Sequence, residues 1–293
     1  MMFKGSITAL LTPFKNSELD TQAFEKFVTW QWQEGTHGVV VGGTTGESPT
    51  LTKTEVTTLT EIALGTSHKG APVIVGTGTN STLSTIEKTL HAQKLGVSAA
   101  LVVVPYYNKP SQEGLFQHYK AVHDATDIPI ILYDVPGRSC TGLTFETVVR
   151  LAELPRIVGI KDSTSKLSNP IKFRKSVKDT FALLCGEDDL AAAFLLYGGH
   201  GNISAVANVA PKLCAAMQNA WGSGDVKKVM EINAHLQPLF ANLFCESNPI
   251  PAKYAAHLLG LMGNEMRLPM VPPLPASQTL IRETLVKVGL LPV

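Results

Sequence analysis

Eight short apolar runs recur along the chain, and a segment with helical character follows each of them. The runs cover residues 6–12, 38–43, 72–78, 99–107, 128–135, 156–162, 181–188 and 201–206. Their starts lie about 28 residues apart on average, which is the length of one strand, one loop and one helix. ALVVV and IPIIL are apolar without alternation, as expected for parallel strands covered on both faces. The pattern predicts an α/β fold, a closed (β/α)8 TIM barrel rather than an open doubly wound sheet.

The segments between the apolar runs begin with residues that commonly cap helices. Asp20, Ser81 and Ser111 each precede a helical pattern. Thr52 and Glu55 have the spacing of a capping box. These signals predict that helices start just after residues 20, 52, 81 and 111.

The domain organisation follows from where the strand pattern stops. After Gly222 the chain has helical patterns and Pro-rich turns but no further strand pattern. No linker-like or low-complexity stretch divides it. We expect a catalytic barrel over residues 1–222 and a C-terminal helical extension over residues 223–293 that packs on the barrel.

Composition and motifs exclude several classes of function. The net charge is +1 with no basic stripe, which argues against nucleic acid or an anionic membrane as the main partner. No apolar run reaches the roughly 18 residues that a bilayer requires, and the N-terminus lacks a signal-peptide cleavage site. The four cysteines are widely spaced and form no CxxC motif, which predicts reduced thiols in a cytoplasmic protein. GTGTNS lacks the third glycine of a dinucleotide site, and GGTTGES lacks the GK[ST] of a P-loop.

Lys161 ends one apolar run, in the stretch RIVGIKDSTS. All strands of such a barrel end at one face, so groups at their carboxyl ends converge there. Apolar surroundings penalise the ammonium form of a lysine, and a neutral amine can attack a ketone to form a Schiff base. The alternative is a salt bridge between Lys161 and Asp162, and the residues alone leave both open.

Other polar groups follow the same strand ends. A phenol such as Tyr133 beside an imine can transfer protons, although an isolated tyrosine is more often a core residue. Thr44 and Thr45 would either cap the next helix or bind an anion such as a carboxylate. Glu47 is expected to fix that loop rather than to react. Further strand-end groups are Asn80, Tyr106, Tyr107, Arg138 and Gly186, and Ile203 lies in the last predicted strand.

Six motifs match one protein family in the same order: GTTGES (43–48), PYYNKPSQEGL (105–115), ILYDVPGR (131–138), GIKDST (159–164), GGHGNIS (198–204) and NPIPAK (248–253). From Gly5 to Leu291 the chain resembles the dihydrodipicolinate synthase family of pyruvate-dependent class I aldolases and lyases. The resemblance implies a carbon–carbon bond-forming lyase that condenses pyruvate with L-aspartate 4-semialdehyde in lysine and diaminopimelate biosynthesis. It also implies a cytoplasmic homotetramer, a dimer of dimers, that needs no metal or organic cofactor.

The resemblance assigns catalytic roles to four residues. Lys161 forms the Schiff base with pyruvate, and Tyr133 donates and accepts protons. Thr44 and Tyr107 match the other members of the proton relay. Tyr107 is expected to reach in from a neighbouring subunit.

The resemblance also assigns the binding of the two substrates. Thr45 and Ile203 match positions that bind pyruvate, with Gly186 nearby. Arg138 matches the residue that holds the carboxylate of the semialdehyde. Without the resemblance, Arg138 would be read as an exposed turn residue.

The sequence departs from the family at the allosteric lysine site. Asn80 and Tyr106 match lysine-binding positions, but Lys53, Val56 and Ser84 replace the histidines and acid of lysine-sensitive members. Losing an acidic partner for the ammonium of lysine should weaken its binding by about 1–3 kcal/mol. We expect weak or absent feedback inhibition.

Two alternatives to this function remain open from the sequence. A sister enzyme such as N-acetylneuraminate lyase would share the barrel, the lysine and the tyrosine, but such enzymes usually have Ser-Thr-Gly-Glu in place of TTGE and lack the arginine. A non-catalytic barrel that serves in binding or regulation would have a broken Lys–Tyr–Thr set. Here the set is intact, and the fold alone does not decide.

Overall fold

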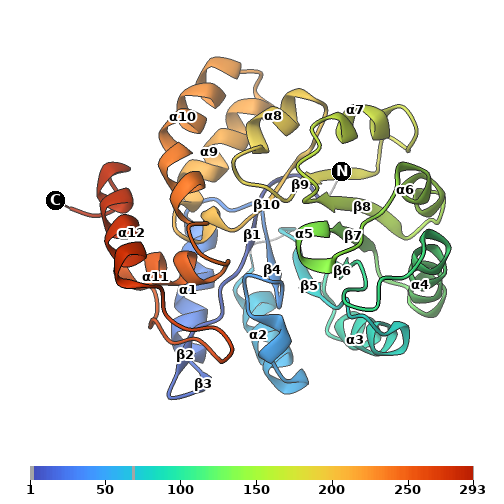
Figure 1. Cartoon of the computed structure of the whole chain (residues 1–293), viewed down its shortest axis with the longest axis horizontal. Coiled ribbons are helices and arrows are strands. Elements are labelled where there is room, and N and C mark those ends of the chain that lie inside the picture. Colours follow the sequence, from blue (N-terminus) through green and yellow to red (C-terminus); the bar gives the residue numbers. More distant parts are fainter. Residues whose placement is uncertain (1–2, 68–69, 293) are drawn as a thin grey trace. The chain divides into compact units, whose positions relative to one another are not determined.

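The computed structural model of the chain describes residues 3–67 and 70–292. Within these ranges, eight parallel strands form a closed barrel in the hydrogen-bonded order β1-β10-β9-β8-β7-β6-β5-β4, with helices around it (Figure 1). The predicted fold class is therefore confirmed. The barrel strands are β1 Gly5–Ala9, β4 Gly38–Val41, β5 Val73–Gly76, β6 Ala99–Val103, β7 Ile130–Asp134, β8 Ile157–Asp162, β9 Ala182–Cys185 and β10 Gly201–Ser204.

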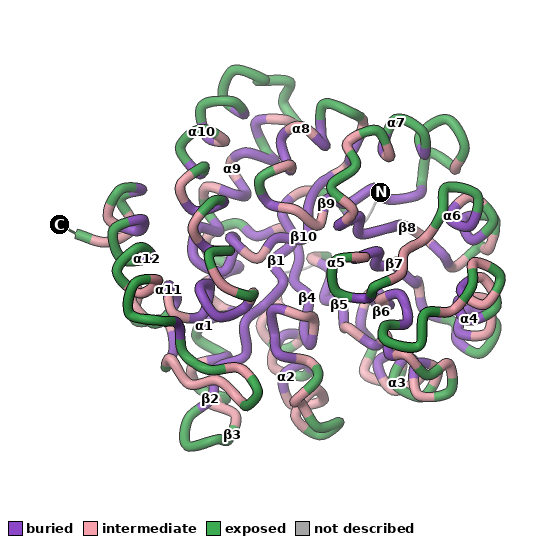
Figure 2. The backbone as a smooth tube through the Cα atoms, in the orientation of Figure 1, coloured by how far each residue is buried: buried purple, intermediate pink, exposed green. Residues whose placement is uncertain are grey.

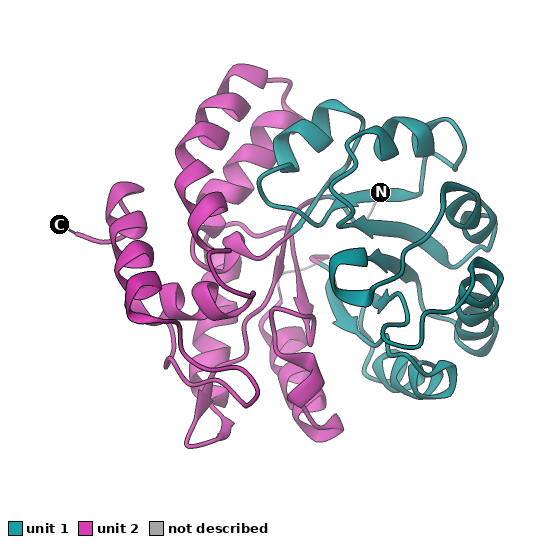
Figure 3. Ribbon diagram, viewed as in Figure 1, with its two compact units in different colours: residues 1–4, 72–203 teal, residues 5–71, 204–293 magenta. Residues whose placement is uncertain are grey.

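The chain divides into two compact units (Figure 3). Unit 1 is mainly Pro72–Ile203, and unit 2 combines Gly5–Ala71 with Ser204–Val293. The boundary predicted at residue 222 does not coincide with this division and stays a prediction. Residue 222 is nevertheless the last residue of a helix, Pro211–Gly222.

Unit 1 alternates strands and helices. Its strands are buried on both faces, as their unbroken apolar runs predicted, and helices cover their outer side (Figure 2). Adjacent strands pair in parallel, with Tyr133 opposite Lys161 and Lys161 opposite Leu184. The helices are α3 Thr82–Lys94, α4 Gln112–Ala125, α5 Pro136–Ser139, α6 Phe145–Ala152, α7 Ser168–Arg174 and α8 Ala191–Leu196.

Unit 2 combines helices from an early and a late part of the sequence. The expected C-terminal helices are present, and no strand follows β10 among the described residues. Its helices are α1 Thr21–Gln33, α2 Lys53–Thr66, α9 Pro211–Gly222, α10 Val226–Asn242, α11 Ile250–Leu258 and α12 Pro275–Lys287, with short 3-10 helices at Ser48–Thr50 and Val206–Asn208.

The predicted helix starts are confirmed. The side chains of Asp20, Ser81 and Ser111 accept hydrogen bonds from backbone N–H groups in the first turns of α1, α3 and α4. Thr52 and Glu55 form the reciprocal capping box of α2. Each cap supplies partners to N–H groups that a helix leaves unpaired at its start.

Several predicted strands end earlier than expected, such as β1 at Ala9 and β9 at Cys185, and two features differ more clearly. The fourth strand was predicted over 99–107, but β6 ends at Val103, and Tyr106 and Tyr107 lie in the loop beyond Pro105. An unpredicted hairpin also forms, with β2 Phe14–Lys15 antiparallel to β3 Glu18–Leu19. Its two-residue turn places Asn16 and Ser17 at φ values of 55° and 66°, the left-handed geometry that matches the twist of a tight hairpin.

Two further observations concern membranes and cysteines. Among the described residues, no helix has both the length and the apolar character to cross a bilayer. All four cysteines lie in the described ranges, and none is part of a disulfide.

Candidate active site

Lys161 is a buried lysine near the carboxyl end of β8. It is 7% exposed. Asp162 points to the opposite face of the strand, because side chains alternate, and its carboxylate accepts hydrogen bonds from Thr164 and Asn169. None of the ion pairs among the described residues involves Lys161. The alternative of a Lys161–Asp162 salt bridge is therefore wrong.

Tyr133 lies beside Lys161 on the neighbouring strand. The two residues are direct partners in the β7–β8 register, and Lys161 Nζ is 4.2 Å from the centroid of the Tyr133 ring. Tyr133 is also 7% exposed. The amine of Lys161 therefore lies over the face of the Tyr133 ring. The structure thus brings together the amine and the phenol that the sequence proposed as a pair.

Gly186 closes the other side of Lys161. It follows β9, and a Cβ at this position would lie 3.0 Å from Lys161 Cε and 1.9 Å from Ser163 Oγ. Only glycine leaves room for both side chains here. Ile203 is 1% exposed and lies in β10, which pairs with β9.

Two polar residues of this cluster were missed in the sequence. Ser163 is buried and hydrogen-bonds to the side chain of Glu187, which follows Gly186. Burial raises the pKa of Glu187, while the Ser163 hydroxyl and the charge of Lys161 act in the opposite direction. The two-residue period of a strand would have placed Ser163 on the same face as Lys161. Glu187 had no comparable signal.

Asp134, which follows Tyr133 in β7, is a second buried carboxyl group. It is 3% exposed, and its Oδ2 accepts a hydrogen bond of 3.2 Å from the Leu143 N–H, while its Oδ1 has no partner among the described residues. Burial raises the pKa of Asp134 to about 7, and the nearby Asp162 adds to the effect. This carboxyl group holds the end of the loop that carries Arg138.

Arg138 is exposed and lies on the short helix α5. This exposure fits both a substrate-binding role and the alternative of an ordinary surface residue. The loop around it has a fixed course, because the Ser139 hydroxyl donates to the backbone oxygens of Val135 and Thr141. Arg138 thus stands at the carboxyl end of β7, on the strand that carries Tyr133.

Tyr106 and Tyr107 differ sharply in environment from Tyr133. They are 39% and 89% exposed, and Tyr107 has a φ of 74°. A tyrosine in the left-handed region is strained and persists only where its surroundings hold it. The loop is tied to its neighbour by Asn108, whose side chain donates to the Asn80 carbonyl over 2.9 Å.

Thr44 and Thr45 belong to the turn after β4 in unit 2. Thr45 is 4% exposed, and its hydroxyl accepts a hydrogen bond of 3.0 Å from the Asn248 side chain. Neither threonine caps α2, since Thr52 does. Glu47 has the expected loop-fixing contacts, because its carboxylate accepts hydrogen bonds from Lys253 and from the Arg267 N–H.

The positions that replace the lysine-sensitive residues lie on two helices. Lys53 is the first residue of α2 and is exposed, with the half-buried Val56 one turn later. Ser84 is in the first turn of α3, where its N–H donates to the Ser81 cap. None of these three side chains is an acid.

Comparisons with known proteins identify the family of the chain. A family model described as the dihydrodipicolinate synthetase family matches residues 2–287. A 4-hydroxy-tetrahydrodipicolinate synthase of Rhodospirillum centenum is 52% identical over 290 residues, covering 99% of this chain and all of the relative. A crystal structure of dihydrodipicolinate synthase from Thermotoga maritima is 42% identical, has a TM-score of 0.97, and covers 99% and 100% of the two chains. A solved monomeric dihydrodipicolinate synthase variant is 43% identical, with a TM-score of 0.97 and 99% and 98% coverage. The chain belongs to the dihydrodipicolinate synthetase family.

Proposed function

We propose that this chain acts as a 4-hydroxy-tetrahydrodipicolinate synthase, a lyase of the class I aldolase type. It joins pyruvate to L-aspartate 4-semialdehyde in lysine and diaminopimelate biosynthesis. The observation that carries the proposal is the buried amine of Lys161 held 4.2 Å from the ring of Tyr133. The full-length similarity to synthases of this name supports the choice of reaction within the family.

The chemistry begins with covalent attachment of pyruvate. The neutral amine of Lys161 adds to the ketone carbon, and loss of water gives a protonated imine. The imine withdraws electrons, so a methyl proton leaves and an enamine forms. Tyr133 donates and accepts protons in these steps, in a relay with Thr44 and Tyr107. Thr45, Gly186 and Ile203 hold pyruvate.

The second half of the reaction makes the new bond. The enamine carbon attacks the aldehyde carbon of the semialdehyde, whose carboxylate Arg138 binds through its planar guanidinium. The aldehyde oxygen takes a proton and becomes the 4-hydroxyl group. The amine of the semialdehyde then adds to the imine carbon and displaces Lys161, which closes the ring and frees the lysine.

The same set of roles implies an assembly and a location. We propose a homotetramer built from two dimers, in which Tyr107 acts in the site of a neighbouring subunit. The 89% exposure and left-handed backbone of Tyr107 support this role, since a partner could hold such a residue. We propose that Asn80 and Tyr106 belong to an allosteric lysine site, with weak or absent inhibition. We also propose that the protein works in the cytoplasm.

A coupled assay tests the function. Purified protein should consume the semialdehyde only when pyruvate is present, and it should release no pyruvate from N-acetylneuraminate. Lys161→Ala should lose turnover by at least about a thousandfold, because the covalent route is closed. Cleavage of N-acetylneuraminate, or normal turnover by Lys161→Ala, would contradict the proposal.

A further inference from the structure

The turn from Gly43 to Ser48 has hydrogen bonds within its own backbone, and it contains one residue with a strained backbone conformation. The Gly43 carbonyl accepts hydrogen bonds from Gly46 and Ser48, and the Glu47 N–H donates to the Thr44 carbonyl over 3.1 Å. Glu47 has a φ of 56°, in the left-handed region. A residue with a side chain stays in that region only if its surroundings fix it. The restraint must therefore come from outside the turn.

The C-terminal region supplies this restraint through the Glu47 anchor, which we define as Glu47, Lys253 and the backbone N–H of Arg267. Lys253 Nζ donates to Glu47 Oε1 over 2.5 Å, and the Arg267 N–H donates to Oε2 over 3.1 Å. The Lys253 and Glu47 side chains are 0% and 2% exposed. Lys253 Nζ also lies 4.3 Å from the centroid of the Phe14 ring.

A buried pair of charges is a poor device for stability alone. Both charges lose their hydration, and a neutral pair of similar volume is often as stable. Burial lowers the pKa of Lys253, although the Glu47 carboxylate opposes that effect. The ion pair fixes the position of the Glu47 carboxylate, because one oxygen binds Lys253 on helix α11 and the other binds the Arg267 N–H in the segment between α11 and α12.

Helix α11 and the residues just before it contact the turn at a second point. Asn248 donates to the Thr45 hydroxyl over 3.0 Å, and Lys253, five residues further along the chain, holds Glu47. Thr44 therefore lies next to Thr45, which Asn248 contacts, and three residues before Glu47, which Lys253 contacts. The Thr12 hydroxyl, from the segment after β1, donates to the Gly46 carbonyl over 2.7 Å. The turn is thus fixed at Gly46 and on both sides of it by side chains from other segments of the chain.

We propose that Lys253 is a positioning residue, which fixes the backbone of Thr44 and Thr45 through its buried pair with Glu47. The inference rests on the proposed function, because it takes Thr44 as part of the proton relay and Thr45 as a pyruvate ligand. In this proposal the C-terminal helical region contributes to catalysis by fixing the turn that carries Thr44 and Thr45, and not by contact with substrate.

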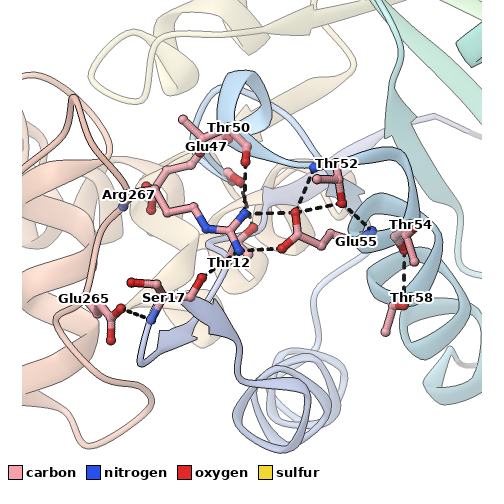
Figure 4. Close-up of polar contacts among 11 residues, drawn as sticks. Thr12, Ser17, Glu47, Thr50, Thr52, Thr54, Glu55, Thr58, Glu265 and Arg267 are labelled. Atoms are coloured by element: carbon pink, nitrogen blue, oxygen red, sulfur yellow. Dashed lines mark hydrogen bonds and ion pairs between the residues drawn. The ribbon is translucent and has the colours of Figure 1, made fainter.

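A nearby ion pair provides a matched control. Arg267 binds the carboxylate of Glu55 with both terminal nitrogens and also donates to the Thr50 carbonyl (Figure 4). This bond holds the pKa of Glu55 at about 2. Glu55 shares Arg267 with the Glu47 anchor, but it binds the side chain of Arg267 whereas Glu47 binds its backbone N–H, and the hydrogen bonds of the Glu55 side chain go to Thr52 and Arg267 rather than to residues 44–47. Its loss should affect stability without moving the two threonines.

The test compares Glu47→Asp, Lys253→Met, the double variant Glu47→Gln/Lys253→Met and the control Glu55→Gln. For each, the melting temperature, kcat and the KM for pyruvate are measured well below the melting transition. Glu47→Asp keeps the charge but is one methylene shorter, so it cannot reach Lys253 without moving the turn. The double variant leaves no unpaired buried charge, so it should melt at a higher temperature than Lys253→Met. If Lys253→Met does not fold, the other variants carry the test.

We expect Glu47→Asp and the double variant to lose at least about tenfold in kcat, with a several-fold rise in KM. Glu55→Gln should melt at a lower temperature yet keep its kcat within about twofold. Wild-type kcat and KM in the double variant and in Glu47→Asp would overturn the proposal. So would an equal loss of kcat in Glu55→Gln. Absence of condensation by the wild-type protein would instead refute the proposed function.

Discussion

A methyl group at residue 186 would test how closely the packing around Lys161 controls the reaction. In Gly186→Ala the new Cβ would meet Ser163 Oγ at 1.9 Å and Lys161 Cε at 3.0 Å. The hydroxyl would have to move by about 1.5 Å to reach ordinary contact, and the lysine by a few tenths of an ångström. The hydroxyl would then leave Glu187, and the amine would shift relative to Tyr133.

The size of the effect follows from these overlaps. Overpacking a dense site costs about 1–3 kcal/mol of folding stability. A misplacement of about 1 Å in an active site can reduce the rate about a hundredfold. Because the amine itself moves by less than this, we expect kcat/KM to fall by about tenfold to a hundredfold.

The assay is steady-state condensation, combined with the rate at which borohydride traps the pyruvate imine. Ser163→Ala introduced into Gly186→Ala removes the atom with the worst overlap, and the nearest remaining Ser163 atom, Cβ, is 3.1 Å from the new methyl group. The double variant should therefore recover about tenfold in kcat/KM. Gly65→Ala is the matched control, because it lies in α2 with no atom within 4 Å of the new Cβ. It should keep full activity.

Two results would refute this reasoning. One is a Gly186→Ala protein with wild-type kcat/KM and a wild-type rate of imine formation. The other is a double variant no more active than Gly186→Ala, since the loss would then not arise from the overlap with Ser163.

Three further predictions concern pH and regulation. Burial raises the pKa of Asp134 to about 7, so the folded state keeps this carboxyl group protonated at pH values where the unfolded state has lost the proton. With respect to this group, the protein therefore has its full stability at acid pH and loses part of it as the pH rises through 7. Asp134→Asn should therefore be more stable than wild type at pH 8 by on the order of 3 kcal/mol in urea unfolding, with little difference at pH 4. Burial lowers the pKa of His118 to about 4, so only the unfolded state takes up a proton as pH falls below about 6.5. His118→Gln should remove about 2 kcal/mol of the stability that wild type loses between pH 7 and pH 4.5, and an unchanged slope would contradict this. About 1 mM lysine should leave most of the condensation rate intact, because positions 53, 56 and 84 carry no acid.

The barrel could be predicted because its signals are local. Each β-branched run and each cap, such as Thr52 with Glu55, is read within a few residues. The hairpin between Phe14 and Leu19 escaped because its strands have two residues each and its turn is Asn-Ser rather than Asn-Gly. Tyr106 and Tyr107 were placed in a strand because aromatic residues favour strands, but Pro105 precedes them and Tyr107 has a left-handed backbone.

The candidate site was predictable only in part. Lys161 and Tyr133 stand out because strand ends converge at one face of a barrel, and the register between β7 and β8 brings them together. The contact between Glu47 and Lys253 joins residues 206 positions apart, so no local pattern contains it. The pairing of Ser163 with Glu187 likewise depends on how the ends of β8 and β9 lie beside each other.

The covalent bond between pyruvate and Lys161 is the central claim, and borohydride reduction followed by peptide mass mapping tests it most directly. With pyruvate present, the peptide that contains Lys161 should gain the mass of one reduced pyruvyl group. Lys253, which is also buried, should stay unmodified because its amine is bound to Glu47. A chain that gains no mass, or that carries the label on any other lysine, would contradict the account.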